Sequence, residues 1–321
     1  MQNVGTPRFY IDSGLYQQAI GAYAPDPDQV SLVQLNPSNI VDKPLNSDGS
    51  SNHVTVPRIS PIKYLAILGH NGGTMYPEWV NNDNTYGGTE NLTEIINAQP
   101  YASNTEVEHE GYSIWTFNDN ESWENLRAVL GNNFTTAGAV SIGDYWDAPT
   151  SPDLKVRLSY IYDGVKNVTT KGGATLSNAS YLKSANWGDR GAWQLGSDEA
   201  GNPISNLRSG RRECSLSWSF IDHTDIMAKV AATTNYGAGD YEVTADPSEN
   251  TLLDGTDFFS VVYNRVFSSH LSFIFNPNGG GTSPNNSPDQ FAICRFVGNS
   301  LKITQTMFRK YSLKIKIREC W

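Results

Sequence analysis

Two short polar clusters hold the residue types that metal binding or acid–base chemistry would need. Glu106, Glu108, His109 and Glu110 could hold a cation or act as paired carboxylates. We favour a solvated strand end, because the next predicted strand supplies no matching acids. The stretch 118–121 (NDNE) resembles a calcium loop only crudely, since it lacks the glycine and the terminal glutamate of the EF-hand pattern. Both clusters are therefore predicted to be surface features.

A third cluster, Asp222-His223-Thr224-Asp225, offers an acid–histidine pair with no nucleophile nearby, so we expect a loop or a helix cap. The chain has no phosphate-binding loop, no H-E-x-x-H motif and no G-x-S-x-G elbow. Its three cysteines have no zinc-ligand spacing, and we interpret Cys214 and Cys294, which lie in predicted strands, as small hydrophobic residues of a protein that folds in a reducing environment. We therefore predict no catalytic residue, no metal site and no cofactor, and a protein that is not an enzyme.

Residues near the predicted polar loops are the candidates for loop binding or for assembly contacts. The stretch 69–73 (GHNGG) follows a predicted buried strand, as a binding loop does, although a tight turn explains it better. Aromatic rings beside polar loops can stack on sugars, but they also form cores and subunit interfaces, which we favour. The candidates are His70, Asn71, Trp79, Tyr86, Trp146, Trp187 and Trp193.

The composition is typical of short strands joined by polar loops. Charged residues make up 17% of the 321 residues and aromatic residues 11%, which disfavours disorder. The net charge of −10 disfavours nonspecific wrapping of nucleic acid, and we expect no specific nucleic-acid binding. The locally basic stretch 309–318 alternates apolar and polar residues, which predicts a half-buried strand with a charged outer face. We find no membrane-spanning run and no secretory signal.

Alternating or apolar runs recur along the chain and predict strands, whereas helical patterns are few. We expect an all-β fold of two antiparallel β-sandwich-like domains with two or three short helices. The Gly/Asn/Ser-rich stretch 171–180 suggests a boundary, giving residues 1–175, with an N-terminal arm, and residues 176–321. The predicted strands include 61–69, 112–117, 154–162, 214–220, 271–275, 291–296 and 312–317, and the predicted helices are 122–130, 222–231 and 257–269.

Two segments predict where apolar side chains are buried. In 214–220 (CSLSWSF), Cys214, Leu216, Trp218 and Phe220 should face inward, with the serines outward. The N-terminal arm, residues 1–12, carries the consecutive residues Phe9, Tyr10 and Ile11. We expect this arm to dock on its own sandwich or on a neighbouring subunit, because three exposed apolar side chains forgo about 1.5–3 kcal/mol of burial each.

Several blocks of the C-terminal third keep their order: residues 211–220 (RRECSLSWSF), 258–260, 270–275 (HLSFIF), 288–296 (PDQFAICRF) and 311–319 (YSLKIKIRE). In this order they resemble the C-terminal domain of phage tail proteins described as minor tail, distal tail or virion structural proteins, over about residues 205–321. The opening stretch 4–12 resembles the start of such proteins. Residues 63–71 (KYLAILGHN) look like the strand and turn of discoidin-like β-sandwiches.

The resemblance implies a structural subunit of a bacteriophage virion, such as a tail, tail-tip or adaptor ring protein. Such a subunit would be made in the host cytoplasm, would reside in the virion tail, and would act through contacts with other virion subunits in a homo-oligomeric ring. The alternative is a carbohydrate-binding module that contacts a host-surface glycan, because discoidin-like sandwiches often bind glycans or lipids. That activity would be an analogy from fold alone. A glycan depolymerase is least favoured, since no carboxylate pair stands out.

Overall fold

The structure is a computed structural model of the 321-residue chain. The described residues are 4–21, 34–35, 41–42, 46–47, 52–57, 62–70, 75–80, 86–88, 93–98, 111–117, 125–130, 136–154, 156–161, 165–179, 196–197, 203–204, 211–226, 256–286, 290–298 and 300–320. The fold is mostly β, as expected from the sequence.

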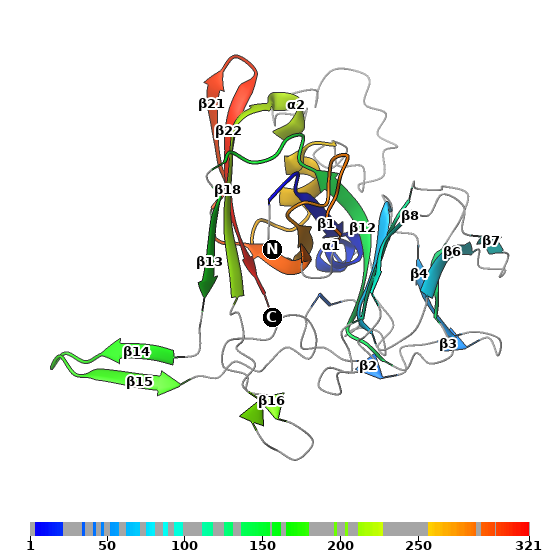
Figure 1. Cartoon of the computed structure of the whole chain (residues 1–321), viewed down its shortest axis with the longest axis horizontal. Coiled ribbons are helices and arrows are strands. Elements are labelled where there is room, and N and C mark those ends of the chain that lie inside the picture. The colour runs from blue at the N-terminus through cyan, green and yellow to red at the C-terminus, as the bar shows by residue number, and fades with distance from the viewer. Residues whose placement is uncertain are drawn as a thin grey trace.

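One antiparallel sheet of eleven strands dominates the molecule and curves around a helical segment at its centre (Figure 1). Its order across the sheet is β13 (Arg157–Ile161), β18 (Arg211–Asp222), β22 (Lys310–Glu319), β20 (Ala292–Phe296), β19 (Phe273–Asn276), β1 (Arg8–Asp12), β12 (Ala139–Asp147), β5 (Tyr64–His70), β9 (Gly111–Thr116) and β8 (Thr93–Ala98). Strand β21 (Lys302–Met307) pairs with β22 beside this path.

Smaller sheets flank the large one. A five-stranded sheet has the order β3 (Asn46–Ser47), β4 (Asn52–Pro57), β10 (Asn125–Leu130), β6 (Met75–Val80) and β7 (Tyr86–Gly88). Three strand pairs stand apart: β11 (Thr136–Ala137) with β2 (Val41–Asp42), β14 (Val165–Thr169) with β15 (Thr175–Ala179), and β16 (Gly196–Ser197) with β17 (Pro203–Ile204). The helices are α1 (Ser13–Ala19), α2 (His223–Ile226) and the π-helix η2 (Phe259–Tyr263).

The helix predictions hold in part. Asp257 caps the helical segment that contains η2, because its Oδ1 accepts a hydrogen bond from Ser260 N at 3.0 Å. Helix α2 lies within the predicted 222–231, of which 227–231 fall outside the described residues. The predicted helix 122–130 is wrong, since Asn125–Leu130 forms β10. Pairing with β4 on one side and β6 on the other overrides its weak helical pattern.

The central strands of the large sheet carry apolar side chains on both faces. Along β1, Phe9 and Ile11 join the core cluster that contains η2, whereas Tyr10 joins the cluster on the opposite face. Strands β19 and β20 alternate in the same way, with Ile274 and Ile293 on the Tyr10 side. Strand β5 is buried along its whole length, as expected of a doubly covered strand. Within the predicted N-terminal arm, Arg8–Asp12 forms an interior strand that buries Phe9, Tyr10 and Ile11.

The alternation predicted for β18 fails at one residue. Leu216 and Trp218 are each 2% exposed, as expected, but Phe220 is 64% exposed. A β-bulge between Trp218 and Ile221 shifts the register against β22, so Ile221 takes the buried position that we had assigned to Phe220. The strand predicted over 154–162 begins later, at Arg157, and Leu154 lies before it and is fully exposed.

The sheet passes through both halves of the chain. N-terminal β1 pairs with β19, and β13 pairs with β18, so strands from either side of residue 175 are neighbours twice. The suggested boundary falls on the β14–β15 hairpin. The division into two sandwich domains stays a prediction.

Candidate functional site

Two of the candidate contact residues lie in strands with buried side chains. His70 ends β5 and is 0% exposed, with its Nε2 atom 3.0 Å from Ser113 Oγ. Trp79 in β6 is 1% exposed and meets Phe117 edge to face, with 5.1 Å between the ring centroids. Neither residue is placed in a loop, and neither side chain offers a surface for stacking on a sugar.

Trp146 in β12 is buried as well. Its ring packs against Phe9 and Phe258, at centroid distances of 5.8 and 5.1 Å, in the main core cluster. Tyr86 begins β7, and only its backbone is described. Outside the described residues lie Asn71, Trp187, Trp193 and the stretches 106–110 and 118–121. The candidates therefore do not form one site among the residues that the structure describes.

The Asp222 cluster caps a helix, as we expected. Asp222 Oδ1 accepts a hydrogen bond from Thr224 N at 3.2 Å, and lies 2.8 Å from His223 Nδ1. Lys310 Nζ donates to Asp222 Oδ2 at 3.0 Å. Lys310 and Thr224 lower the pKa of Asp222 below its usual range, so the carboxylate is charged. The cluster fastens the end of β18 to β22.

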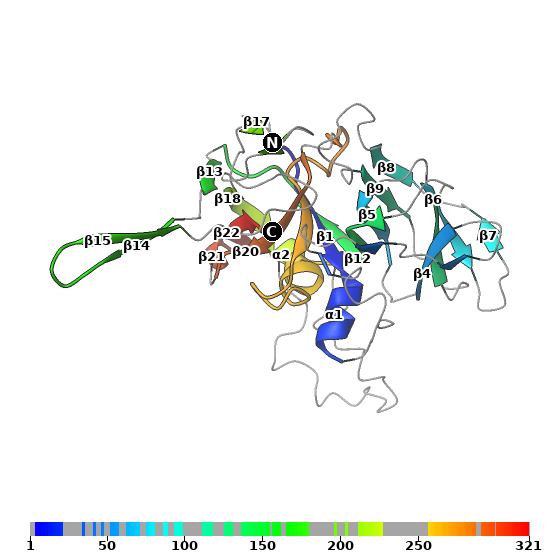
Figure 2. The ribbon, with the colours of Figure 1, turned by 90° about the horizontal axis from the view of Figure 1, so that it is seen from below.

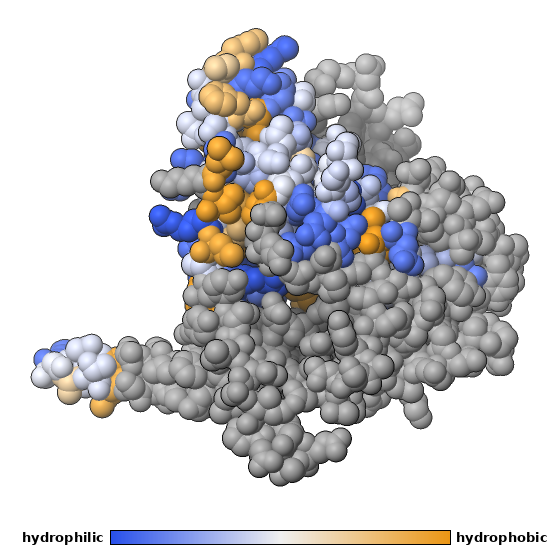
Figure 3. All heavy atoms as spheres, in the orientation of Figure 1, coloured by the Kyte–Doolittle hydropathy of each residue, from blue (hydrophilic) through white to orange (hydrophobic). Residues whose placement is uncertain are grey.

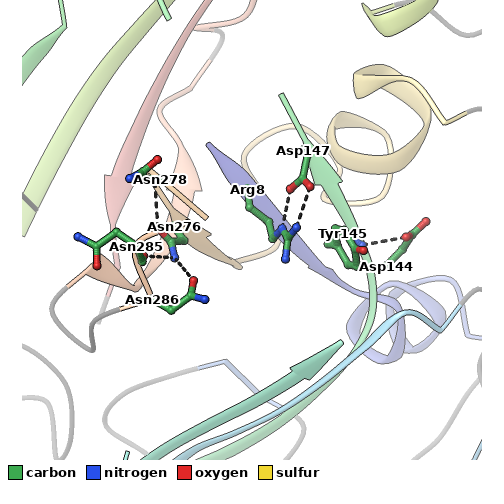
Figure 4. Close-up of polar contacts among 8 residues, drawn as sticks. All are labelled: Arg8, Asp144, Tyr145, Asp147, Asn276, Asn278, Asn285 and Asn286. Carbon is green, nitrogen blue, oxygen red and sulfur yellow. Dashed lines mark hydrogen bonds and ion pairs between the residues drawn. The ribbon is translucent and has the colours of Figure 1, made fainter. Parts of the chain in front are cut away.

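A clamp between β1 and β12 holds the N-terminal strand in register (Figure 4). Arg8 faces Asp147 across the strand pair, and its Nη2 donates to Asp147 Oδ2 at 2.7 Å. The guanidinium also lies 4.3 Å from the ring centroid of Tyr145. Arg8 is thus occupied by partners on its own sheet, which indicates a structural role.

Four asparagines shape the loop that follows β19 (Figure 4). Asn276 Nδ2 donates to Asn285 O at 3.0 Å, and Asn276 Oδ1 accepts from Asn278 N at 3.0 Å. A Cβ atom on Gly5 would lie only 1.9 Å from Asn278 Oδ1. The loop therefore packs closely against Gly5. The side-chain amide of Asn276 is used to hold the loop in shape.

Arg212 and Glu319 form a buried ion pair that joins β18 to the end of β22. Arg212 Nη2 lies 3.0 Å from Glu319 Oε1, and both side chains are less than a tenth exposed. The same nitrogen donates to Phe291 O at 3.1 Å. The pair and its hydrogen bond to Phe291 thus connect β18, the end of β22 and the residue before β20. These contacts indicate a structural role and not a catalytic one.

The outer face of β13, β18, β22 and β21 carries a cationic groove that the sequence analysis missed. The groove has a volume of about 760 Å³. We call it the cationic groove; its polar lining residues are Arg157, Ser215, Ser217, Ser300, Lys302, Lys314 and Lys316. The sequence showed the positive charges of β22, but only the strand register shows that Arg157 and Lys302 lie beside them.

The β14–β15 hairpin projects away from the rest of the molecule as a two-stranded arm (Figures 1 and 2). Val168 and Leu176 face each other across the two strands and are 51% and 61% exposed. Figure 3 shows apolar residues at the surface of this arm. We call this hairpin, residues 165–179, the arm.

The described residues hold no other feature that favours chemistry. Burial raises the pKa of Cys214 to about 11, so its thiol stays protonated and is a poor nucleophile. Within the described ranges, no three His, Cys, Asp or Glu side chains gather as metal ligands do. No described helix has the length and apolar character needed to cross a membrane.

Comparison with known proteins adds no family to this picture. The chain matches no protein-family model, no curated protein and no solved structure. The features that bear on function are therefore the cationic groove, the arm and the resemblance in the sequence.

Proposed function

We propose that this chain is a structural subunit of a bacteriophage virion, a tail, tail-tip or adaptor ring protein that acts through protein–protein assembly. The sequence resemblance over residues 205–321 motivates the choice of particle. The observation that carries the assembly role is the arm. In this proposal the protein resides in the virion tail and works without catalytic turnover.

The arm is poorly supported by its own chain. A two-stranded hairpin alone is marginally stable in water, because it cannot cover its apolar face. Val168 and Leu176 form a cross-strand apolar pair on such a hairpin. Covering them would stabilise the arm by up to about 1.5–3 kcal/mol per side chain. A neighbouring subunit is the natural source of that cover.

Among the described strands, the path of the large sheet ends at β13 and at β8. Exposed edges pair readily with other chains, and closing a ring removes them. The proposed assembly is a homo-oligomeric ring that also contacts other virion subunits. Each subunit would have two β-sandwich domains, residues 1–175 and 176–321, with the arm at their boundary.

The glycan-binding alternative has less support. It needs exposed aromatic rings beside loops, and two of its candidates, Trp79 and Trp146, are buried. A depolymerase would need a carboxylate pair, and the acidic clusters that the sequence offers, residues 106–110 and 118–121, lie outside the described residues.

Mass spectrometry of purified particles tests the proposal directly. We expect peptides of this chain in the virion, and chemical cross-links from Lys166 or Lys171 in the arm to a neighbouring subunit. Particles that lack the chain would show that the proposal is wrong. Cross-links confined to residues of the same chain would remove the role that we assign to the arm.

A further inference from the structure

The cationic groove gathers positive charge on a chain that is acidic as a whole. Lys302 lies directly opposite Lys314 in the pairing of β21 with β22. Like charges that face each other across two strands destabilise the sheet. Neither lysine forms an ion pair with any described residue. An anion between the two side chains would relieve this repulsion.

The remaining charges of this face are arranged in rows across the strands. Arg157 and Lys316 lie on either side of Ser215 in the strand register, which places a hydroxyl between two cations on the groove floor. Lys314 and Lys316 are two residues apart on one strand, so their side chains leave the same face about 7 Å apart. The groove thus presents several cations in series rather than a single point charge.

Two acids that contact groove residues, Glu213 and Asp153, are already bonded. Glu213 Oε1 lies 2.5 Å from Lys316 Nζ, and Glu213 Oε2 lies 2.6 Å from Arg318 Nη2. Asp153 accepts hydrogen bonds from Ser217 and Ser219. Neither acid lines the groove itself. Arg157, Lys302 and Lys314 therefore remain as positive charges that these acids do not neutralise.

We propose that the cationic groove binds a chain of phosphodiester groups. Three of its four cations are lysines, which bind phosphate as point charges. The Ser215 hydroxyl supplies a hydrogen bond to a phosphate oxygen, whereas Ser217 donates to Asp153 and Ser300 donates to Lys316 O. No aromatic ring lines the described groove, so nucleobases would gain no stacking there. The groove would therefore bind the phosphodiester backbone and not the bases. A polyol phosphate polymer has such a backbone.

The net charge of −10 limits the affinity, because the protein as a whole repels a polyanion. Binding should therefore weaken steeply as salt increases. The inference does not depend on the virion assignment, since the groove is defined by its own residues.

Fluorescence anisotropy with a short abasic phosphodiester oligomer tests the proposal on the full chain. The double variant Lys302→Gln/Lys314→Gln should bind about tenfold more weakly or worse, with a shallower salt dependence. The matched control Lys166→Gln/Lys171→Gln, which removes two lysines from the arm, should bind like the original protein. Without ligand, the groove variant should melt no lower than the original, because a repulsion has been removed.

Two further probes identify the ligand chemistry. An oligothymidylate of equal length should bind no more tightly than the abasic oligomer, and polyglutamate of equal charge should bind more weakly. Equal binding by the groove variant and the original protein would show that the cationic groove is not the binding site. Tighter binding of polyglutamate would overturn the phosphodiester assignment, and tighter binding of oligothymidylate would overturn the assignment to a chain without bases.

Discussion

Strand β1 and the arm are both short stretches of extended chain, yet the protein uses them in opposite ways. Strand β1 pairs with β12 and β19, and its Phe9, Tyr10 and Ile11 are each 0% exposed. Among the described strands, the two strands of the arm pair only with each other, and Val168 and Leu176 are more than half exposed. The difference shows that strand propensity alone does not decide whether a strand is buried. The number of neighbouring strands and the number of covered faces decide its burial.

The largest effect should come from removing the central strand. Deleting residues 1–12 takes β1 out from between β12 and β19, which separates the two parts of the large sheet. It also removes Phe9 from a core cluster where four other rings lie within 6 Å of its own. We expect no cooperatively folded protein, as measured by circular dichroism and thermal melting. A truncated chain that melts like the full one would place β1 outside the core.

Trp218 and Phe220 test the bulge, which separates core from surface within one strand. Trp218 is 2% exposed and its Nε1 donates to Thr150 O at 2.9 Å. Trp218→Ala should lower the free energy of unfolding by about 3–5 kcal/mol, from lost burial and a cavity. Phe220→Ala should change it by less than about 0.5 kcal/mol. Chemical denaturation gives both values, and equal losses would contradict the register shift.

Asp12 links the central strand to pH. Burial raises its pKa from 3.8 to about 7, although its Oδ1 also accepts a hydrogen bond from Leu15 N at the start of α1. The folded state then holds a proton that the unfolded state releases above pH 4, so this residue makes stability fall as pH rises from about 4 to 7. Above pH 7 the contribution of Asp12 to the free energy of unfolding no longer changes with pH. The effect is of order 2–4 kcal/mol.

The variant Asp12→Asn isolates that contribution, because asparagine keeps the helix cap and does not titrate. We expect the variant to gain stability relative to the original protein as pH rises from 4 to 7. Denaturation curves at several pH values measure the difference. A constant difference between the two proteins across this range would show that Asp12 ionises normally.

Features that depend on the local sequence pattern could be predicted. Features that depend on pairing between distant strands could not. The alternation of β22 was predictable, and Leu313, Ile315 and Ile317 are buried as expected. The bulge at Phe220 was not, because no turn residue marks it in the sequence.

The candidate sites show the same limit. Trp146 stands beside polar residues in the chain, but pairing of β12 with β1 turns it into the core. The cationic groove was missed because Arg157, Lys302 and Lys314 are far apart in sequence. Only the order of β13, β18, β22 and β21 brings them to one face.

The smallest effect on folding, and the most specific effect on assembly, should come from the arm. Val168→Ser/Leu176→Ser replaces two apolar side chains that are each more than half exposed, so the free energy of unfolding should change by less than about 0.5 kcal/mol per residue. If a neighbouring subunit covers the arm, the same change should reduce incorporation of the chain into particles. Quantitative mass spectrometry of particles made with each protein measures this. Thr169→Ser/Thr175→Ser, at the next paired position of the arm, is the matched control and should be incorporated normally. Normal incorporation of the apolar variant would show that the arm projects into solvent in the assembled state as well, and that β1 and the arm differ in burial alone.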